Sequence, residues 1–239
     1  MAIPRDRSPM STKHIRIAEL AREDKTRQFS SIGHLLTVEA LYEAFESLRK
    51  DASAGVDRVT YAGYASEARS KIQKLHDRLK RGQYRAQPLR RIYIPKEDGR
   101  QRPISIPSLE DKIVQKAAAD LLSAIYEQDF LECSHGFRRG RGPHDALDEV
   151  GRVICRRPIS TVLEADISGY FDAIVRSVLT EMIGKRVRDG SILRLIGKWI
   201  NVGVIEDGRL LVSETGTGQG QVISPLRLLS IRLCLRGIL

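Results

Sequence analysis

The feature that most constrains the fold is an Asp-Gly pair between two short strand-like runs, in LRRIYIPKEDGRQRPISI (residues 89–106). Asp98-Gly99 is typical of a tight β-hairpin turn, because such a turn needs positive φ at its central residues. Pro95 and Pro103 cannot donate a hydrogen bond to a neighbouring strand, so both strands are expected at the edge of a sheet. The segment therefore predicts a β-hairpin.

The rest of the chain alternates helical patterns with further short strands. Apolar spacing predicts helices from Thr37 to 48, from 66 to 81, after the capping residue Ser108, near 175–185 and near 191–201. The run STVLEADI (160–167) has the pattern of a strand that ends in an acid, and a second Asp-Gly pair joins VGVIE to RLLVS at 207–208. This order predicts an α+β fold in which helices pack on short antiparallel hairpins.

Composition excludes several protein classes. The 239 residues are 41% hydrophobic and 29% charged, which is unlike collagen-like, wholly disordered or transmembrane chains. Three cysteines without a Cys-x-x-Cys pair favour neither a disulfide framework nor a zinc ribbon. The N-terminus lacks the apolar run of a signal peptide, so we expect a reducing, cytoplasmic protein without a membrane partner.

The formal net charge of +10 is unevenly distributed. Residues 81–116 hold nine Lys or Arg and four acids, and GFRRGR (136–141) adds three arginines, whereas residues 166–226 hold seven of each sign. Such clusters favour an anionic polymer, because Lys and Arg neutralise phosphates. The alternative is a basic surface that only maintains solubility.

The hairpin carries cations that could act together. Arg91, Lys96, Arg100 and Arg102 surround its turn, and strand alternation allows several of them to reach one side. Closing on a triphosphate is one role for such a group, since Lys offers a point charge and Arg a bidentate fork. The alternative is an exposed charged hairpin that prevents edge-to-edge aggregation.

Three further segments could carry chemistry. Asp166 directly follows the predicted strand, where a carboxylate suits Mg²⁺ or, alternatively, caps a helix or turn. The segment HGFRRGRGPH (135–144) combines arginines with glycines that permit close approach of a phosphate chain, and with Cys133 it lacks the ligand spacing of a zinc site. Gln219 lies in GTGQGQ, a small-residue turn that would expose its amide but is no Walker loop.

Taken in order, these segments resemble the reverse transcriptases encoded by group II introns, the intron maturases. The resemblance covers roughly residues 35–226 and rests on AGVDRVT (54–60), LRRIYIPKEDGRQRPISIPSLEDKIVQ (89–115), HGFRRGRGPHDAL (135–147), LEADISGYFDAI (163–174) and GTGQGQVISPL (216–226). It implies a right-hand polymerase that copies an RNA template from a DNA primer, with dNTPs and two Mg²⁺ ions, and that also binds intron RNA.

The resemblance also implies roles for single residues. Asp166 corresponds to the first palm carboxylate, which bridges both metals, and the Ile167 carbonyl would complete a coordination shell. The positions that would contact the incoming nucleotide are Lys96, Arg102, Phe171 and Gln219, with Phe171 beneath the sugar. The positions expected along the template or other RNA are Arg91, Arg100, His135, Arg138, Arg139 and Arg141.

The chain departs from the family in its last part. One Asp cannot hold two dications roughly 3.5–4 Å apart, and the family's Tyr-x-Asp-Asp partner is absent, as is any Asp-Asp pair. We therefore expect a loosely ordered basic lead or frayed helix (1–34), fingers as the more stable part (35–160), a partial, poorly ordered palm (161–226) and an atypical tail (227–239) without a thumb. Three hypotheses follow: a truncated polymerase with little activity, a non-catalytic RNA-binding fragment, or a degenerate product. The oligomeric state stays open.

Overall fold

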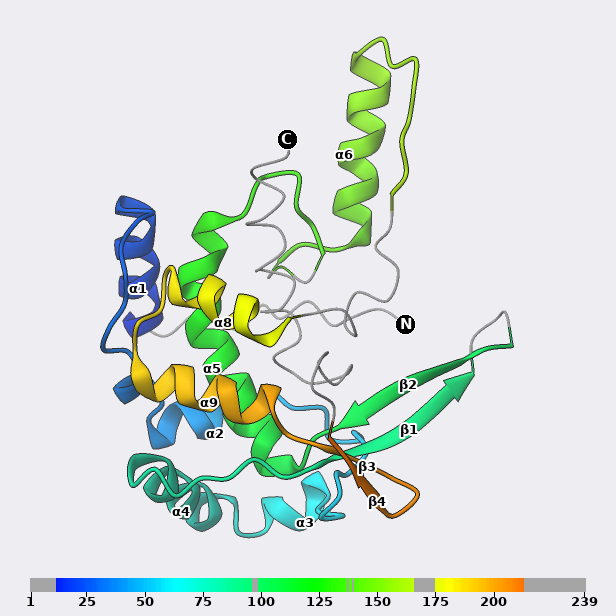
Figure 1. Cartoon of the computed structure of the whole chain (residues 1–239). Coiled ribbons are helices and arrows are strands. Elements are labelled where there is room, and N and C mark those ends of the chain that lie inside the picture. Colours follow the sequence, from blue (N-terminus) through cyan, green and yellow to red (C-terminus); the bar gives the residue numbers. More distant parts are fainter. Residues whose placement is uncertain (1–11, 96–98, 137, 139, 166–174, 213–239) are drawn as a thin grey trace. The chain divides into compact units, whose positions relative to one another are not determined.

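The computed structural model describes residues 12–95, 99–136, 138, 140–165 and 175–212 (Figure 1). The chain divides into two compact units, which are treated separately below. Unit 1 comprises Met1–Lys25 and Ala124–Ser168, and unit 2 comprises Thr26–Ser123 and Gly169–Leu239. The boundary between them falls within helix α5 (Leu109–Tyr126).

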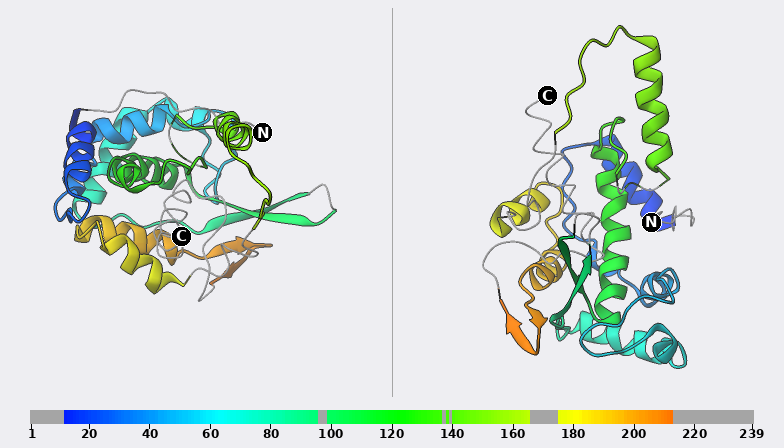
Figure 2. Two further views of the ribbon diagram at one scale, coloured as in Figure 1. Left: turned by 90° about the horizontal axis from the view of Figure 1, so that it is seen from above. Right: turned by 90° about the vertical axis from the view of Figure 1, so that its right-hand side faces the viewer.

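Unit 2 contains most of the helices that the sequence predicts. Thr37 caps α2 by accepting a hydrogen bond from Ala40 N at 3.2 Å, and Gly82 ends α4 with φ of +71°. In the views of Figure 2, α5 lies between α2 on one side and α8 and α9 on the other. The helices are α2 (Val38–Glu46), α3 (Tyr61–Ala65), α4 (Ala68–Lys80), α8 (Arg176–Gly184) and α9 (Gly190–Ile200), with the 3₁₀ turn η1 at Gly33–Leu35.

Helix α5 supplies the centre of the core. Ser108 caps it by accepting from Asp111 N at 3.2 Å, as the sequence predicts, and the Asp111 carboxylate accepts from the Tyr84 hydroxyl and from Gln87 N. The apolar stripe predicted for this helix is buried throughout. Its members are Ile113, Val114, Ala117, Leu121, Leu122 and Ile125.

A four-stranded sheet in the order β2-β1-β3-β4 completes unit 2. Its strands are β1 (Leu89–Pro95), β2 (Gln101–Ile106), β3 (Val204–Glu206) and β4 (Arg209–Leu211). The predicted Asp207-Gly208 turn is confirmed, since both residues have positive φ (48° and 76°) between the paired Glu206 and Arg209. The predicted β1–β2 hairpin also forms, with Gly99 at φ of 77°, and Asp98 lies outside the described residues.

The edge prediction holds for β2 but not for the base of β1. Strand β1 pairs with β2 along its length and in parallel with β3 through Leu89 and Arg90. Pro95 lies beyond this short second contact, where β1 has one neighbour. A proline prevents hydrogen bonding only at its own position. Pro95 therefore could not indicate whether the start of β1 has one neighbouring strand or two.

Unit 1 contains α1 (Thr12–Glu23), the 3₁₀ turn η2 (Glu127–Asp129) and α6 (Pro143–Arg156). Within the stretch predicted as a loosely ordered lead or a frayed helix, residues 12–23 form a helix whose Ala18 and Ala21 are buried. Arg22 Nε of α1 donates to Gln128 Oε1 of η2 at 3.0 Å. Long-range contacts of this kind, which a local pattern cannot reveal, stabilise a short polar helix.

The strand predicted at 160–167 does not form over its described part. Residues 158–165 have no regular structure, and Val162 and Leu163 are 80% and 90% exposed. A strand needs a neighbour, and no neighbour is paired with these residues. Residues 166 and 167 lie outside the described part of the chain.

Of the helices that the structure describes, none combines the length and the apolar character needed to cross a lipid bilayer.

Candidate functional site

The β1–β2 ribbon distributes its arginines over two faces. Arg91 pairs with Ser105, whereas Arg102 pairs with Ile94. Directly paired residues share a face and successive residues alternate, so Arg91 and Arg102 lie on opposite faces. The register pairs even-numbered residues with even-numbered ones, so Arg91 is not among the cations that strand alternation could bring to the side of Arg102.

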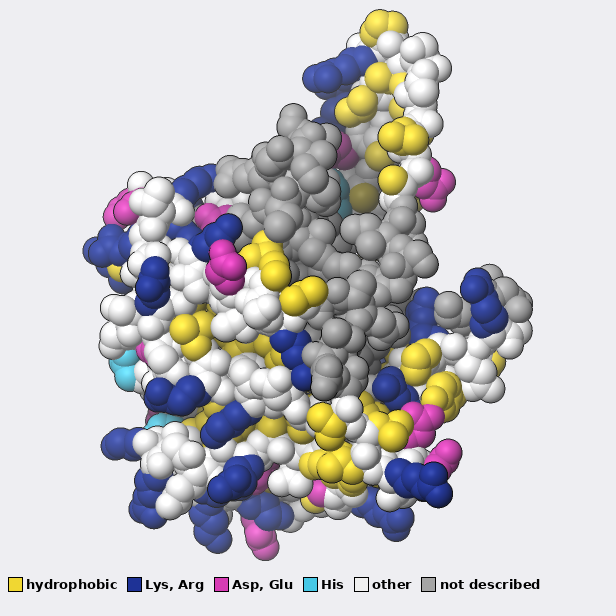
Figure 3. All heavy atoms as spheres, viewed as in Figure 1, with side chains coloured by type: hydrophobic (Ala, Val, Ile, Leu, Met, Phe, Trp, Pro, Cys, Tyr) yellow, Lys and Arg dark blue, Asp and Glu magenta, His cyan; other side chains and the backbone are white. Residues whose placement is uncertain are grey.

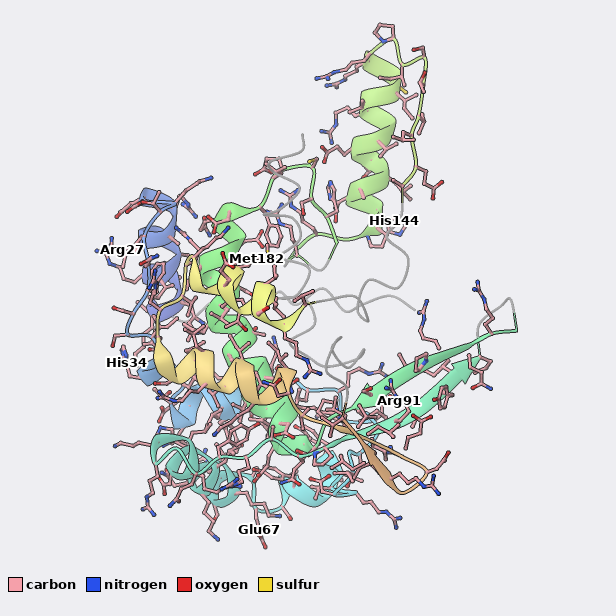
Figure 4. All side chains as sticks on the ribbon, in the orientation of Figure 1. Arg27, His34, Glu67, Arg91, His144 and Met182 are labelled. Carbon is pink, nitrogen blue, oxygen red and sulfur yellow. The ribbon has the colours of Figure 1, made fainter. Side chains whose placement is uncertain are left out.

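Arg91 is directed into a contact within the sheet (Figure 4). Its Nε lies 3.8 Å from Glu206 Oε2 of β3, and the Tyr93 hydroxyl donates to the same carboxylate. This hydrogen bond is the main cause that raises the pKa of Tyr93. Arg91 thus helps to join β1 to the second hairpin, and nothing in this contact points to a template.

The far end of the ribbon presents the other cations. Arg100 and Arg102 are exposed, and Arg102 stands on the face of β2 that it shares with Ile94. Lys96, predicted to act beside Arg102, lies outside the described residues. The described geometry therefore leaves Arg102 accessible to a ligand, while Arg91 is held by Glu206.

The arginine-rich segment of unit 1 folds partly on itself. Arg138 is buried, and its Nε and Nη2 donate to Glu127 Oε1 at 2.8 and 2.6 Å. Its Nη1 donates to the carbonyls of Leu131 and Ser134, both at 2.9 Å, and the guanidinium lies 4.9 Å from the centroid of the Phe130 ring. Through these contacts Arg138 holds Glu127, Leu131 and Ser134 together, and its predicted contact with template RNA stays a prediction.

Two neighbours of Arg138 also have acidic partners. Arg141 Nη2 donates to Glu132 Oε2 at 2.5 Å, a hydrogen bond that lowers the pKa of Glu132. His135 Nε2 lies 2.6 Å from Glu149 Oε2 of α6. Sequence reasoning missed these pairs, although the acids lie only nine to fourteen residues away. Arg139, the remaining predicted RNA contact of this segment, lies outside the described residues.

The AGVDRVT block is held by two cations, the partly buried Arg90 of β1 and the buried Lys112 of α5. Arg90 Nε and Nη2 donate to the Ala54 carbonyl at 3.0 and 2.6 Å, and Lys112 Nζ donates to the Ser53 carbonyl at 2.6 Å. Burial is the main cause that lowers the pKa of Lys112. A Cβ on Gly55 would lie 2.6 Å from Ser108 Cα, so only glycine fits there. These residues position the base of the ribbon, a role that sequence reasoning did not assign.

A buried polar cluster connects the segment before β1 with α5 and α9. The Tyr84 hydroxyl donates to Asp111 Oδ1 at 2.5 Å and accepts from Trp199 Nε1 at 2.9 Å. Gln87 N donates to Asp111 Oδ2 at 2.9 Å, and burial is the main cause that raises the pKa of Asp111. Lys198 Nζ donates to the Tyr84 carbonyl at 2.5 Å. The cluster fixes the approach of the chain to the ribbon.

Asp189 joins the start of α9 to the segment before α2. Its Oδ2 accepts from the backbone N–H groups of Ile32 and Gly33, both at 2.7 Å, and its Oδ1 accepts from Ser191 N and Ile192 N at 2.8 and 3.2 Å. Burial alone would raise the pKa of Asp189, but the four N–H donors together lower it. Asp189 is thus a helix cap and a tertiary clamp.

The residues that the resemblance assigns to the metal and to part of the nucleotide contact are not described. Asp166, Ile167, Phe171 and Gln219 all lie outside the described residues. Within residues 12–95, 99–136, 138, 140–165 and 175–212, no three His, Cys, Asp or Glu side chains gather as a metal ion would require. The described side chains therefore supply no complete metal site of their own.

Comparison with known proteins defines the class. The family model described as reverse transcriptase (RNA-dependent DNA polymerase) matches residues 94–231, a range that includes the β1–β2 turn, Asp166 and Gln219. A solved partial Cas6-RT-Cas1–Cas2 complex covers 84% of this chain and 33% of that chain, with a TM-score of 0.51 and 22% identity. The likeness in structure confirms the predicted α+β fold, with reverse transcriptase fingers and palm. Polymerases of this class generally use divalent metal ions.

Curated relatives narrow the class further. Protein YkfC of Escherichia coli is 37% identical over 175 residues, which make up 72% of this chain and 46% of YkfC. The group II intron-encoded protein LtrA of Lactococcus lactis is 33% identical over 216 residues, 88% of this chain and 35% of LtrA. The chain belongs to the group II intron reverse transcriptase and maturase family, and it spans less than half the length of these relatives.

Proposed function

We propose that the β1–β2 ribbon and the Asp166 segment serve RNA-directed DNA polymerisation. The observation that carries this proposal is the exposed Arg102 near the end of the ribbon, within the range that matches the reverse transcriptase family. Arg102 is on the opposite face from the Arg91–Glu206 contact, so an approaching triphosphate meets a cation without an acid paired to it across the sheet. In this proposal Lys96 and Arg102 hold the incoming dNTP.

The reaction joins the primer to the nucleotide. The primer 3′-oxygen forms a bond to the α-phosphorus, the bond from that phosphorus to the bridging oxygen breaks, and pyrophosphate leaves with the electron pair. The proton of the 3′-hydroxyl passes to a base or to solvent. Bound Mg²⁺, for which Asp166 and the Ile167 carbonyl are the proposed ligands, would favour the deprotonated oxygen and the departing charge. Phe171 and Gln219 are proposed to contact the sugar and the nucleotide.

The proposed organisation follows the resemblance. Residues 1–34 would form a basic lead and residues 35–160 the fingers. Residues 161–226 would form part of a palm, followed at 227–239 by a tail that is atypical of the family. An RNA template, a DNA primer and intron RNA are the proposed macromolecular partners, in the cytoplasm. Because the sequence holds no Asp-Asp pair beside Asp166, we also propose that this chain alone extends primers little or not at all.

Primer extension tests that proposal. Incubation of the purified chain with an annealed RNA template, DNA primer, dNTPs and Mg²⁺ is expected to give little or no product. Product that is abolished by Asp166→Ala would contradict the proposed inactivity and would at the same time establish the role of Asp166.

Binding of dNTP tests the role of the ribbon independently of turnover. Arg102→Ala is expected to weaken the affinity for dTTP, measured by calorimetry, by about tenfold, since a charge-assisted hydrogen bond contributes about 1.5 kcal/mol. Arg91→Ala is the matched control on the opposite face, and it should change the affinity little. Equal losses in the two variants, or no binding by the unaltered chain, would contradict the assignment of the ribbon.

An RNA-binding function without catalysis is the second candidate. The nine cations and four acids of residues 81–116 favour it, and this excess does not depend on a metal site. Retained RNA binding in Asp166→Ala, together with inactivity of the unaltered chain in primer extension, is the result expected of such a protein.

A further inference from the structure

A long stretch of the chain carries positive charge without any acid. Between Asp77 and Glu97 the sequence holds seven Lys or Arg and no Asp or Glu. Helix α9, GSILRLIGKWI, holds Arg194 and Lys198 and likewise no acid. Clusters of one sign are unusual on a solvated surface, where charges are normally mixed.

Helix α4 directs its cations away from the core. Ala68, Ile72 and Leu75 are its buried residues, and they occupy one face. Lys74 and Arg81 lie seven residues apart on the outer side, and both are exposed, as are Lys80 and the nearby Arg85. The C-terminal half of α4 and the turn after it therefore form a basic surface.

This surface continues onto α9, which belongs to the same unit. Lys198 Nζ donates to the Tyr84 carbonyl at 2.5 Å, and Trp199 Nε1 donates to the Tyr84 hydroxyl at 2.9 Å, so α9 packs on the turn that carries Arg85. Arg194 is exposed one helical turn before Lys198. Figure 3 shows Lys and Arg side chains gathered over α4 and α9. We name Lys74, Lys80, Arg81, Arg85 and Arg194 the basic face.

The acids near the basic face accept hydrogen bonds from groups outside it. Asp189, at the start of α9, is buried and accepts four backbone N–H groups, and Glu110 accepts from Arg78 Nη2 at 2.6 Å. Asp77 accepts from Gln73 Nε2 at 3.1 Å. Among the residues that the structure describes, the five side chains of the basic face make no ion pair. Their charges are available to an external anion.

The basic face also lacks apolar anchors. Among the described residues, no large hydrophobic side chain is exposed between 66 and 88 or between 185 and 201. Protein interfaces need a buried apolar core, and stable membrane contact needs inserted apolar groups. A phosphate backbone needs only cations spaced along a surface, and Lys74 and Arg81 are about 10 Å apart along the helix axis, which spans more than one phosphate interval.

We propose that the basic face binds the phosphate backbone of RNA, at a place separate from the β1–β2 ribbon and from the arginine-rich segment of unit 1. This inference rests on the proposed RNA partner of the family and names where that partner is held. Lys80 and Arg81 also lie at the C-terminus of α4, where a cation interacts favourably with the helix dipole. If that were their only role, their substitution would lower the free energy of unfolding and leave the affinity for RNA unchanged.

The test compares two variants with the same change of charge. The first removes four cations of the basic face, as Lys80→Gln, Arg81→Gln, Arg85→Gln and Arg194→Gln. The control removes four exposed cations of unit 1, as Lys13→Gln, Arg152→Gln, Arg156→Gln and Arg157→Gln. Affinity for a labelled RNA stem-loop of mixed sequence is measured by fluorescence anisotropy between 50 and about 300 mM salt. Far-ultraviolet circular dichroism verifies that both variants are folded.

The basic-face variant is expected to bind RNA at least about tenfold more weakly at 0.1 M salt, with the slope of log K against log salt reduced by about two to four. The control is expected to retain most of the affinity and of the slope. Equal losses in both variants would overturn the proposal in favour of diffuse charge, and loss of binding to anionic lipid vesicles instead of RNA would assign the face to a membrane.

This outcome is separable from that of the proposed function. If the unaltered chain binds RNA and the basic-face variant binds equally well, the inference about the face fails while an RNA-binding family function stands. If Arg102→Ala does not change the affinity for dTTP, the assignment of the ribbon fails. The inference about the basic face is still decided by the RNA affinities of the two variants.

Discussion

Helices α5 and α6 have opposite surroundings although both carry an apolar stripe. In α5 the stripe is fully buried, with Ile113, Leu121 and Ile125 at 0% exposure. In α6 no residue is buried, and Leu147 and Val150 are 65% and 54% exposed. Both helices are amphipathic, but an amphipathic pattern specifies neither what covers a helix nor whether anything does.

The same contrast bears on the chemistry. Residues 158–165, which follow α6 and lead to Asp166, form no strand and expose Val162 and Leu163. The β1–β2 ribbon, in contrast, is anchored at its base by Arg90 and Lys112 and by pairing with β3. The ribbon proposed to contact the triphosphate is thus anchored to the packed core at its base, and the segment that leads to the proposed metal ligand is not.

The largest expected effect on the free energy of unfolding comes from a substitution in α5. Leu121→Ala should lower the free energy of unfolding by about 2–5 kcal/mol, because it leaves a cavity at a fully buried site. Urea unfolding followed by circular dichroism measures the change. A loss below about 1 kcal/mol would show that α5 is not the centre of the core.

A smaller loss is expected within unit 1. Arg138→Ala should cost about 1–3 kcal/mol, since it leaves Glu127 and the carbonyls of Leu131 and Ser134 without their donor. Limited proteolysis of residues 127–141 should accelerate correspondingly. RNA affinity tests the other role of Arg138. A variant that resists protease as well as the unaltered chain but binds RNA more weakly would support the predicted contact of Arg138 with template RNA.

Asp189 predicts a dependence on pH. Its pKa is lowered in the folded chain, so its contribution is present above the unfolded pKa of about 3.9 and is lost as the pH falls through the lower folded value. Asp189→Asn should cost about 1–2 kcal/mol at pH 7 and progressively less below pH 4. Unfolding of both proteins across this range measures the difference, and a cost that does not change with pH would contradict the clamp.

The smallest effect is expected in α6. Leu147→Ala should change the free energy of unfolding by less than about 0.5 kcal/mol, because the side chain is already largely exposed. The measurement is the same urea unfolding as for Leu121→Ala. A loss as large as that in α5 would show that the stripe of α6 is covered in solution and would remove the contrast.

Local signals were sufficient for most of the fold. Thr37, Ser108 and the two Asp-Gly pairs act on neighbours within a few residues, and the elements that they bound were predicted correctly. Pairing across the chain could not be predicted in this way. The central position of the start of β1 depends on Val204 and Ile205, more than a hundred residues later.

The candidate site was harder to predict than the fold. Composition marked Arg91 and Arg138 as cations for an external phosphate, but it could not show that Arg91 lies in an ion pair with Glu206 and that Arg138 donates to Glu127. Conversely, residues 31–80 have nearly balanced charge in sequence, so composition does not single out Lys74, which the structure exposes on the same helix as Lys80. The partners of a charged side chain are the groups close to it in three dimensions, and only some of these are close to it in sequence.

Amide hydrogen exchange of the full chain tests the central contrast most directly. The account predicts slow exchange across the part of α5 between residues 109 and 123, because its stripe is buried, and rapid exchange across residues 158–165, which have no regular structure. Protection of 158–165 comparable to that of α5 would contradict the account, since it would place the segment before Asp166 in a stable sheet.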